Sequence, residues 1–184
     1  LVCHVEIGMN KVAFQAWRVN VGRVSVYLLD TNRPENEQHF RDLTLRVYGG
    51  DSTTRIMQEI LLGIGGVRLL RALGVAPSVF HMNEGHAAFL QLERIREYVE
   101  DQGQPFDVAL WTARADALFT THTPVPAGND SFAFDLMDRF FGDFWPQMGL
   151  QREQFLALGR YDYSWGPQFS MTVLALRTGG RANG

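Results

Sequence analysis

Residues 78–100 read SVFHMNEGHAAFLQLERIREYVE and carry the clearest fold signal in the chain. Residues 78–82 are mostly apolar and β-prone, and the polar residues 83–86 end that run. From about Ala87 to Glu100, apolar side chains recur at helical spacing and predict an amphipathic helix. The stretch therefore predicts a strand, a loop and a helix in succession, which is the repeating unit of an α/β fold.

The same alternation continues on both sides of this stretch. Downstream, the sequence predicts a helix over 106–114 and a buried strand over 117–121. Upstream, apolar spacing predicts a helix that Asp51 or Ser52 caps and that Gly74 ends. Strands that alternate with helices imply right-handed crossovers and a parallel sheet covered on both faces. We therefore expect an α/β, Rossmann-like parallel-sheet domain.

The flanking regions predict the rest of a single α/β domain over 1–184, with βα units at about 51–122. The first thirty residues predict strands, of which 24–29 is almost continuously apolar and reads as buried on both faces. Residues 31–42 are polar and contain Pro34, which predicts a surface loop without regular structure. Residues 132–178 predict a mostly helical remainder.

Composition narrows the class of protein. The 184 residues carry a net charge of −3 and are 46% hydrophobic, which predicts a globular domain and argues against nucleic acid as a partner. No apolar run reaches the ~18 residues of a membrane span. Cys3 is the only cysteine, which predicts a reduced, cytoplasmic protein. Lys11, the only lysine, lies in a turn-like stretch, so we expect it to be solvated. The start at Leu1 and the tail TGGRANG lead us to expect a segment cut from a longer polypeptide.

Two polar loops are the candidate binding site. Ligands of open parallel sheets bind beyond the carboxyl ends of the strands, and the segments that leave those ends are 83–86 and 122–129. Both carry histidine, and both should face one crevice. The first offers donors, acceptors and a carboxylate, which suit sugar hydroxyls; its residues are Asn83, Glu84 and His86. In the second, Pro124 and Pro126 stiffen the exit after His122.

Other interpretations of these residues compete. A metal triad of His81, Glu84 and His86 is one, but the spacing matches no helical zinc motif, so we expect no metal. Strand alternation turns His81 away from Met82, into the core. His86 could merely cap the following helix, and His122 alone could be structural. The pairing of the two loops favours a functional role.

Three further patterns favour structure over function. The glycines of 62–67 resemble part of a dinucleotide fingerprint but fall inside a predicted helix, which favours close helix packing. Acidic residues of the 87–100 helix and its end should lie on a solvated face; they are Glu93, Glu97 and Asp101. The aromatics of 132–145 recur at helical spacing and should belong to the core.

Several long strings resemble the α-glucan phosphorylase family, which includes glycogen, starch and maltodextrin phosphorylases, in its bacterial and archaeal branch. They are YLLDTN (27–32), YGGD (48–51), QEILLGIGGVRLLRALG (58–74), HMNEGHAAF (81–89) and FTTHTPVPAGND (119–130). The resemblance continues through MTVLALR and ANG near the end of the chain. It implies an internal fragment of the N-terminal half of a two-domain GT-B glycosyltransferase. In that family, phosphate cleaves the terminal α-1,4-linked glucose to glucose 1-phosphate, with pyridoxal phosphate as cofactor.

The resemblance also implies roles for the loop residues. His122 corresponds to the catalytic-site histidine that contacts the transferred glucosyl unit, and Thr123 follows it in the same wall. Asn83, Glu84 and His86 line the neighbouring part of the glucose site, and 30–51 gates access. The family's cofactor lysine and phosphate-binding residues belong to the other domain, and nothing in this sequence matches them. We therefore expect no cofactor on this chain and no activity of the chain alone.

The partners implied are an α-1,4-glucan or maltooligosaccharide and inorganic phosphate, and the loops left exposed would also allow a homo-oligomer. Two other functions stay open. A glycosyltransferase of the same architecture could use a sugar nucleotide, with activity independent of phosphate. A non-catalytic glucan-binding domain would bind oligosaccharide without turnover.

Overall fold

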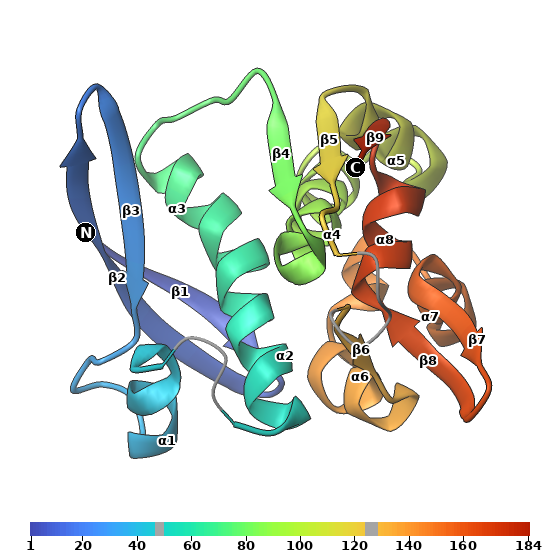
Figure 1. The fold of residues 1–184 in the computed structure, drawn as a ribbon, viewed down its shortest axis with the longest axis horizontal. Helices are drawn as coiled ribbons and strands as arrows, with labels where there is room; N and C mark the ends of the chain where they lie inside the picture. Colours follow the sequence, from blue (N-terminus) through green and yellow to red (C-terminus); the bar gives the residue numbers. More distant parts are fainter. Residues whose placement is uncertain (47–49, 124–128) are drawn as a thin grey trace.

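The computed structural model describes residues 1–46, 50–123 and 129–184. Within those ranges the strands form three three-stranded sheets, one of them parallel and two antiparallel. Figure 1 shows the N-terminal strands at one end of the molecule and the C-terminal helices with the third sheet at the other. The parallel strands lie between them, so the predicted α/β class with a parallel sheet is confirmed.

The N-terminal sheet is an antiparallel meander of β1 (Val2–Ile7), β2 (Asn10–Val21) and β3 (Val24–Asp30). Its strands confirm the prediction from sequence. The expectation that the third strand is buried on both faces was wrong, because β3 is an edge strand: Val24 is 64% exposed and Leu28 is 52% exposed.

A short helix, α1 (Gln38–Arg41), and a 3₁₀ turn (Asp42–Thr44) follow β3. The sequence predicted no regular structure over 31–42, which was wrong for the last part of that stretch. Phe40 and Leu43 are both buried in the core. Their spacing of three residues puts both side chains on the inner side of a helical turn, which orders an otherwise polar segment.

A long helical rod runs through α2 (Ser52–Ile60), a π-helical stretch (Leu61–Gly65) and α3 (Gly66–Ala72). Asp51 caps it, since its Oδ1 accepts a hydrogen bond of 2.9 Å from the backbone N–H three residues on. Gly74 follows with φ +67°, a left-handed conformation that suits glycine and ends the helix. Both predicted boundaries are confirmed.

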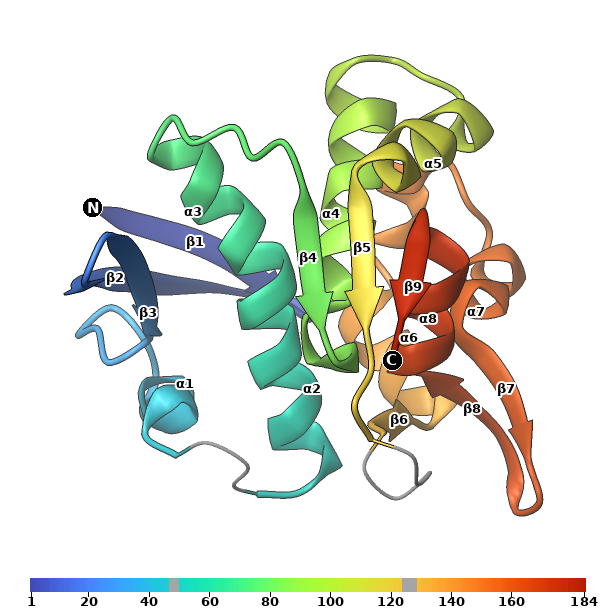
Figure 2. The same ribbon diagram turned by 45° about the horizontal axis from the view of Figure 1, so that its top comes forward.

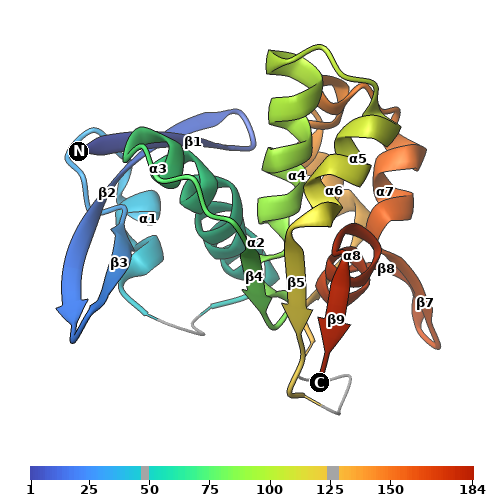
Figure 3. The ribbon, with the colours of Figure 1, turned by 90° about the horizontal axis from the view of Figure 1, so that it is seen from above.

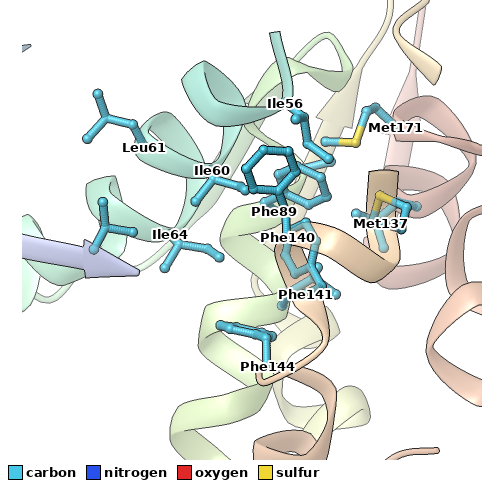
Figure 4. Packing of buried hydrophobic residues seen from close by; sticks show 14 of the residues in the cluster. Ile56, Ile60, Leu61, Ile64, Phe89, Met137, Phe140, Phe141, Phe144 and Met171 are labelled. Carbon is cyan, nitrogen blue, oxygen red and sulfur yellow. The ribbon is translucent and has the colours of Figure 1, made fainter. Parts of the chain in front are cut away.

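Glycine lets this rod approach α4 (Phe89–Arg96) closely. A Cβ atom on Gly63 would lie 2.7 Å from the backbone nitrogen of Leu90, which is closer than carbon atoms tolerate. Figure 4 shows the resulting contact, in which Ile56 and Ile60 of the rod face Phe89. The prediction of close helix packing, in place of a phosphate loop, is confirmed.

The parallel sheet has the order β4 (Phe80–Asn83), β5 (Ala117–Thr120), β9 (Arg181–Asn183). Figure 2 shows the three strands side by side, with α4 and α8 behind them. β9 was not predicted from the sequence, because we interpreted the glycine-rich tail TGGRANG as the cut end of a segment. Gly180 brings the chain past α5 (Phe106–Ala115), where a Cβ would collide with a backbone oxygen of that helix's last turn.

The remainder contains three helices where a mostly helical region was predicted, α6 (Phe134–Phe141), α7 (Arg152–Gly159) and α8 (Met171–Thr178). It also contains a small antiparallel sheet that was not predicted, β6 (Ser131–Phe132), β8 (Gly166–Ser170) and β7 (Arg160–Tyr163). Figure 3 shows the β7–β8 hairpin at the edge of the molecule. Across the described ranges, none of the helices is long and apolar enough to cross a membrane.

The core confirms one side-chain prediction and corrects another. Four of the aromatics predicted to be core are buried, and Phe134 and Trp145 are half-buried and pack against the core; the buried four are Phe132, Phe140, Phe141 and Phe144. Glu93, predicted on a solvated face, is only 1% exposed. Arg68 and Arg96 donate hydrogen bonds of 2.9 and 3.0 Å to its carboxylate, which compensates the loss of water. Asp101 is exposed, as predicted.

Candidate functional site

The two predicted loops meet beyond the carboxyl ends of β4 and β5. These strands are parallel neighbours, and their register pairs Asn83 with Thr120. Both chains therefore leave the sheet at the same edge, as parallel pairing requires. Residues 124–128, including the two prolines predicted to stiffen the second loop, lie outside the described residues.

Glu84 joins the first loop to the second. Its Oε1 accepts hydrogen bonds from the backbone N–H of His122 at 2.6 Å and from the Thr123 hydroxyl at 3.1 Å. Its Oε2 accepts one from the Thr121 hydroxyl at 3.1 Å. The hydrogen bond from the His122 backbone, together with those hydroxyls, lowers the pKa of Glu84. Both carboxylate oxygens are thus engaged by the protein, which fixes the second loop onto the first.

The backbone of Glu84 is held in an unusual conformation. Among the described non-glycine residues, Glu84 alone has a positive φ, at 62° with ψ 178°. Residues other than glycine rarely adopt this backbone conformation, and the strain is of order 1–3 kcal/mol. The conformation aims the carboxylate at the neighbouring strand end, and the three hydrogen bonds compensate the strain.

His122 presents its ring beside Asn83. Its Nε2 lies 3.0 Å from Asn83 Oδ1, and because the amide oxygen can only accept, Nε2 carries the proton. The His122 side chain is exposed, whereas Thr123 is half-buried. The structure thus brings together four of the predicted site residues; they are Asn83, Glu84, His122 and Thr123.

His86 belongs to a separate cluster that was not predicted from the sequence. Its Nδ1 lies 2.7 Å from Asp130 Oδ2 and 3.4 Å from Glu59 Oε1. Nη2 of Arg55 lies 2.7 Å from Asp130, 3.0 Å from Glu59 and 3.2 Å from His86 Nδ1. Glu59 and Asp130 fall in strings that resemble the phosphorylases, but no spacing in the sequence indicates that these four residues meet.

Charge and burial shift the pKa values in this cluster. Hydrogen bonds to Asp130 and Glu59 raise the pKa of His86 to about 9. Burial raises the pKa of Glu59 to about 8. For Asp130, burial opposes ionisation, but hydrogen bonds from His86 and Arg55 outweigh it and lower the pKa. Near neutral pH, His86 is therefore a cation that donates its Nδ1 proton to the Asp130 carboxylate.

The three residues of the metal triad weighed from the sequence have different partners: His81 lies against Thr120, Glu84 binds the second loop and His86 lies against Asp130. His81 is exposed and its Nε2 lies 2.8 Å from the Thr120 hydroxyl, so the prediction that it points into the core was wrong. The reason is that Met82 takes the inward face of β4. Glu59, His86 and Asp130 do offer ligand atoms within 4.8 Å of one another. Arg55 already supplies the cation there.

A cavity of about 460 Å³ lies between β3, the 3₁₀ turn at 42–44 and the helical rod. Leucines of β3, of that turn and of the π-helical stretch line it, together with Arg55, Glu59 and His86. Among the predicted site residues, His86 is the one that reaches it. The crevice predicted between the two loops is therefore distinct from this cavity.

Pyridoxal phosphate binds proteins through a Schiff base to a lysine, and Lys11 is the only lysine in this sequence. The position of Lys11 therefore decides whether the described residues could hold this cofactor. Lys11 is exposed on β2, where it pairs with Glu6 in the N-terminal sheet. It therefore lies in a different sheet from β4 and β5, whose ends carry the two loops. The residues described do not fit the cofactor.

Comparison with known proteins gives the family. No protein-family model matches the chain. The glycogen phosphorylase of Mycobacterium tuberculosis (strain ATCC 25618 / H37Rv) is 46% identical over 196 residues, which cover 100% of this chain and 22% of that protein. The maltodextrin phosphorylase of Thermococcus litoralis is 46% identical over 183 residues, with 100% of this chain and 21% of that protein covered. The glycogen phosphorylase of Aquifex aeolicus is 35% identical over 177 residues, with 96% and 25% covered.

The chain spans about a fifth to a quarter of the length of these relatives. The identity is as high with an archaeal maltodextrin phosphorylase as with a bacterial glycogen phosphorylase. It runs over the whole chain and includes both loops and the α2–α3 rod. Along its full length, this chain is therefore homologous to a segment of the glycogen and maltodextrin phosphorylases, which confirms the resemblance seen in the sequence.

Proposed function

We propose that this segment supplies one wall of the glucosyl site of an α-glucan phosphorylase. Such an enzyme is a glycosyltransferase that moves the terminal α-1,4-linked glucose of a glucan or maltooligosaccharide onto inorganic phosphate and releases glucose 1-phosphate. The observation that carries the proposal is 46% identity over the whole chain to proteins named glycogen and maltodextrin phosphorylase. The meeting of the two loops at one sheet edge supports it.

His122 is the proposed catalytic residue. Glycosyl transfer passes through a sugar ring that carries positive charge, so a fixed oxygen near that ring lowers the barrier. We assign this role to the backbone carbonyl of His122, whose own peptide N–H is held by Glu84 at 2.6 Å. The exposed imidazole, oriented by Asn83, would hydrogen-bond a glucosyl hydroxyl.

The neighbouring residues have distinct proposed parts in this wall. Asn83 and Thr123 flank His122 and would complete the polar surface that faces the sugar. Glu84 lies beside these residues, whereas His86 lies in the neighbouring cluster with Asp130, and the hydrogen bonds of both run to other protein groups. We therefore propose that these two residues serve substrate binding mainly by holding the loop that carries His122.

The segment alone should be inactive. Pyridoxal phosphate, when bound to a phosphorylase, supplies a phosphate group for proton transfer, and the residues described here do not fit it. We propose that the cofactor and the phosphate-binding groups come from the part of the relatives that this chain does not match, as in a GT-B enzyme with its site between two halves. The expected compartment is the cytoplasm.

The test is release of glucose 1-phosphate from maltopentaose and inorganic phosphate. Three samples are compared: a phosphorylase polypeptide that contains this segment, its His122→Ala variant, and the 184-residue chain. We expect turnover in the first, a loss of about 100-fold in the second because a positioned catalytic group is missing, and none in the third. His4→Ala is the matched control, since that histidine is exposed on β1 in the N-terminal sheet.

The same assay separates the alternatives. If glucose transfer requires a sugar nucleotide and does not depend on inorganic phosphate, the longer polypeptide is a nucleotide-sugar glycosyltransferase and not a phosphorylase. Maltopentaose binding without turnover in the longer polypeptide would indicate a glucan-binding domain.

A further inference from the structure

The segment that carries His122 is bound to the rest of the protein at both ends, at residues 121–123 and at residues 129–130. Asp130 accepts a backbone hydrogen bond of 3.0 Å from Met171, the first residue of α8. One residue earlier, Asn129 Oδ1 accepts a hydrogen bond of 3.0 Å from the Thr172 hydroxyl. The chain that leaves β5 at Thr121 thus returns to a fixed point on the α8 N-terminus.

The Asp130 side chain adds a second set of contacts from other elements. Arg55 reaches it from α2 at 2.7 Å, and His86 reaches it from the first loop at 2.7 Å. Glu59, one turn along α2, lies 3.0 Å from Arg55 and is only 2% exposed. Two cations, the Asp130 carboxylate and the carboxyl group of Glu59 therefore share one partly buried site, where the attraction between the cations and Asp130 is screened less than at the surface.

The same short turn, residues 84–86, forms hydrogen bonds with both ends of the segment. Glu84 binds residues Thr121 to Thr123, and His86, two residues later, binds Asp130. A shift of Asp130 would therefore be transmitted to His122 by the turn that holds both residues. Displacement of a catalytic group by about 1 Å can reduce rates 100-fold.

We propose that Asp130 is a positioning residue for His122: clamped by Arg55 and His86, it fixes the far end of the segment whose near end Glu84 fixes. The proposal rests on the proposed function, in which His122 contacts the transferred glucosyl unit. Asp130 itself need not touch the sugar. A merely structural ion pair is the competing explanation, and it predicts lost stability without a change at His122.

The variants for the test are chosen to separate these explanations. Asp130→Asn keeps the shape of the side chain and removes its charge. Arg55→Lys keeps the cation but offers a single ammonium in place of the planar fork, and serves if Asp130→Asn fails to fold. Asp138→Asn is the matched control, since Asp138 accepts a 2.6 Å hydrogen bond from Arg152 on the α6–α7 side of the molecule.

Two readouts are needed. In the 184-residue chain, ¹³C labelling of histidine gives signals for five rings, and that of His122 is identified by its loss in His122→Gln. In a phosphorylase polypeptide that contains the segment, kcat and KM for maltopentaose are measured with saturating phosphate. Urea unfolding of the chain records the stability of every variant.

We expect Asp130→Asn to move the His122 ring signal and to lower kcat about tenfold while KM stays within about threefold, because the group is misplaced in the transition state. Arg55→Lys should move the same signal in the same direction by less. The proposal is overturned if Asp130→Asn loses stability but moves the His122 signal no more than Asp138→Asn does. A wild-type polypeptide that releases no glucose 1-phosphate would defeat the proposed function, and the ring signal would still decide whether Asp130 positions His122.

Discussion

The backbone N–H of His122 donates a 2.6 Å hydrogen bond to Oε1 of Glu84, so the turn after β4 sets the path of the chain after β5. This bond lies at the strand ends of a parallel pair, where side chains of successive βα units come together. A carboxylate at this place organises the candidate site from within the protein.

Replacement of Glu84 by glutamine tests that relationship. The substitution turns one carboxylate oxygen into an NH₂ group, which cannot accept a hydrogen bond, and leaves the other as a neutral oxygen. At least one of the three hydrogen bonds therefore weakens or is lost. We expect the free energy of unfolding to fall by about 1–3 kcal/mol. The His122 backbone amide should shift in a ¹H–¹⁵N spectrum. An unmoved amide would show that Glu84 does not hold His122 in solution.

The positive φ of Glu84 predicts an order of stability between two truncations. Glu84→Ala and Glu84→Gly both remove the carboxylate, but only glycine adopts φ 62° with ψ 178° without strain. We expect the glycine variant to be the more stable by about 1 kcal/mol. Urea midpoints of the two variants give the comparison, and equal midpoints would mean that the turn relaxes.

Gly63 and Gly66 form a matched pair for the helix contact. A Cβ on Gly63 would strike the backbone of α4, whereas a Cβ on Gly66 would meet nothing within 4 Å. We expect Gly63→Ala to lower the free energy of unfolding by about 1–3 kcal/mol through overpacking. Gly66→Ala should raise it by about 0.5–1 kcal/mol, because alanine favours the helix. Thermal unfolding of both variants checks the opposite signs.

The free energy of unfolding should fall as the pH rises through the range in which His86 and Glu59 lose their protons. The folded pKa of His86, about 9, exceeds its ordinary 6.5, so its contribution is fully present below pH 6.5 and is lost towards pH 9. Burial raises the pKa of Glu59 from 4.5 to about 8. Between those pH values the folded chain keeps a proton that the unfolded chain releases, so Glu59 also makes the free energy of unfolding fall as the pH rises.

We expect the free energy of unfolding to drop between pH 6.5 and pH 9 by on the order of 1 kcal/mol, after allowance for solvent screening at a partly exposed pair. His86→Gln should flatten the curve over the upper part of this range. Asp138→Asn, whose carboxyl lies in another ion pair, should leave the curve unchanged. A wild-type curve that is flat from pH 6.5 to pH 9 would contradict the assigned protonation states.

Local patterns account for most of what the sequence predicted correctly. The helix from Asp51 to Gly74 follows from a cap, apolar spacing and a terminal glycine, all of which are signals along the chain. The meeting of Asn83 with His122 follows from a topological rule, because neighbouring parallel strands end at one edge.

Contacts between distant residues account for what was missed. Arg55 and Asp130 are 75 residues apart, and nothing in their own surroundings indicates that they pair. Glu93 was expected on the surface because isolated carboxylates usually are. Its burial depends on Arg68, 25 residues away, as much as on its neighbour Arg96.

The third strand of the parallel sheet also bears on how the chain folds. Thr120 pairs with Asn183, 63 residues later, so the sheet is completed only when the last part of this sequence docks. The antiparallel meander at the other end needs only adjacent segments. During synthesis the meander can therefore form early, while β4 and β5 must wait with one edge open. Helices α6 to α8 are made in that interval, and they assemble beside a sheet that is still unfinished.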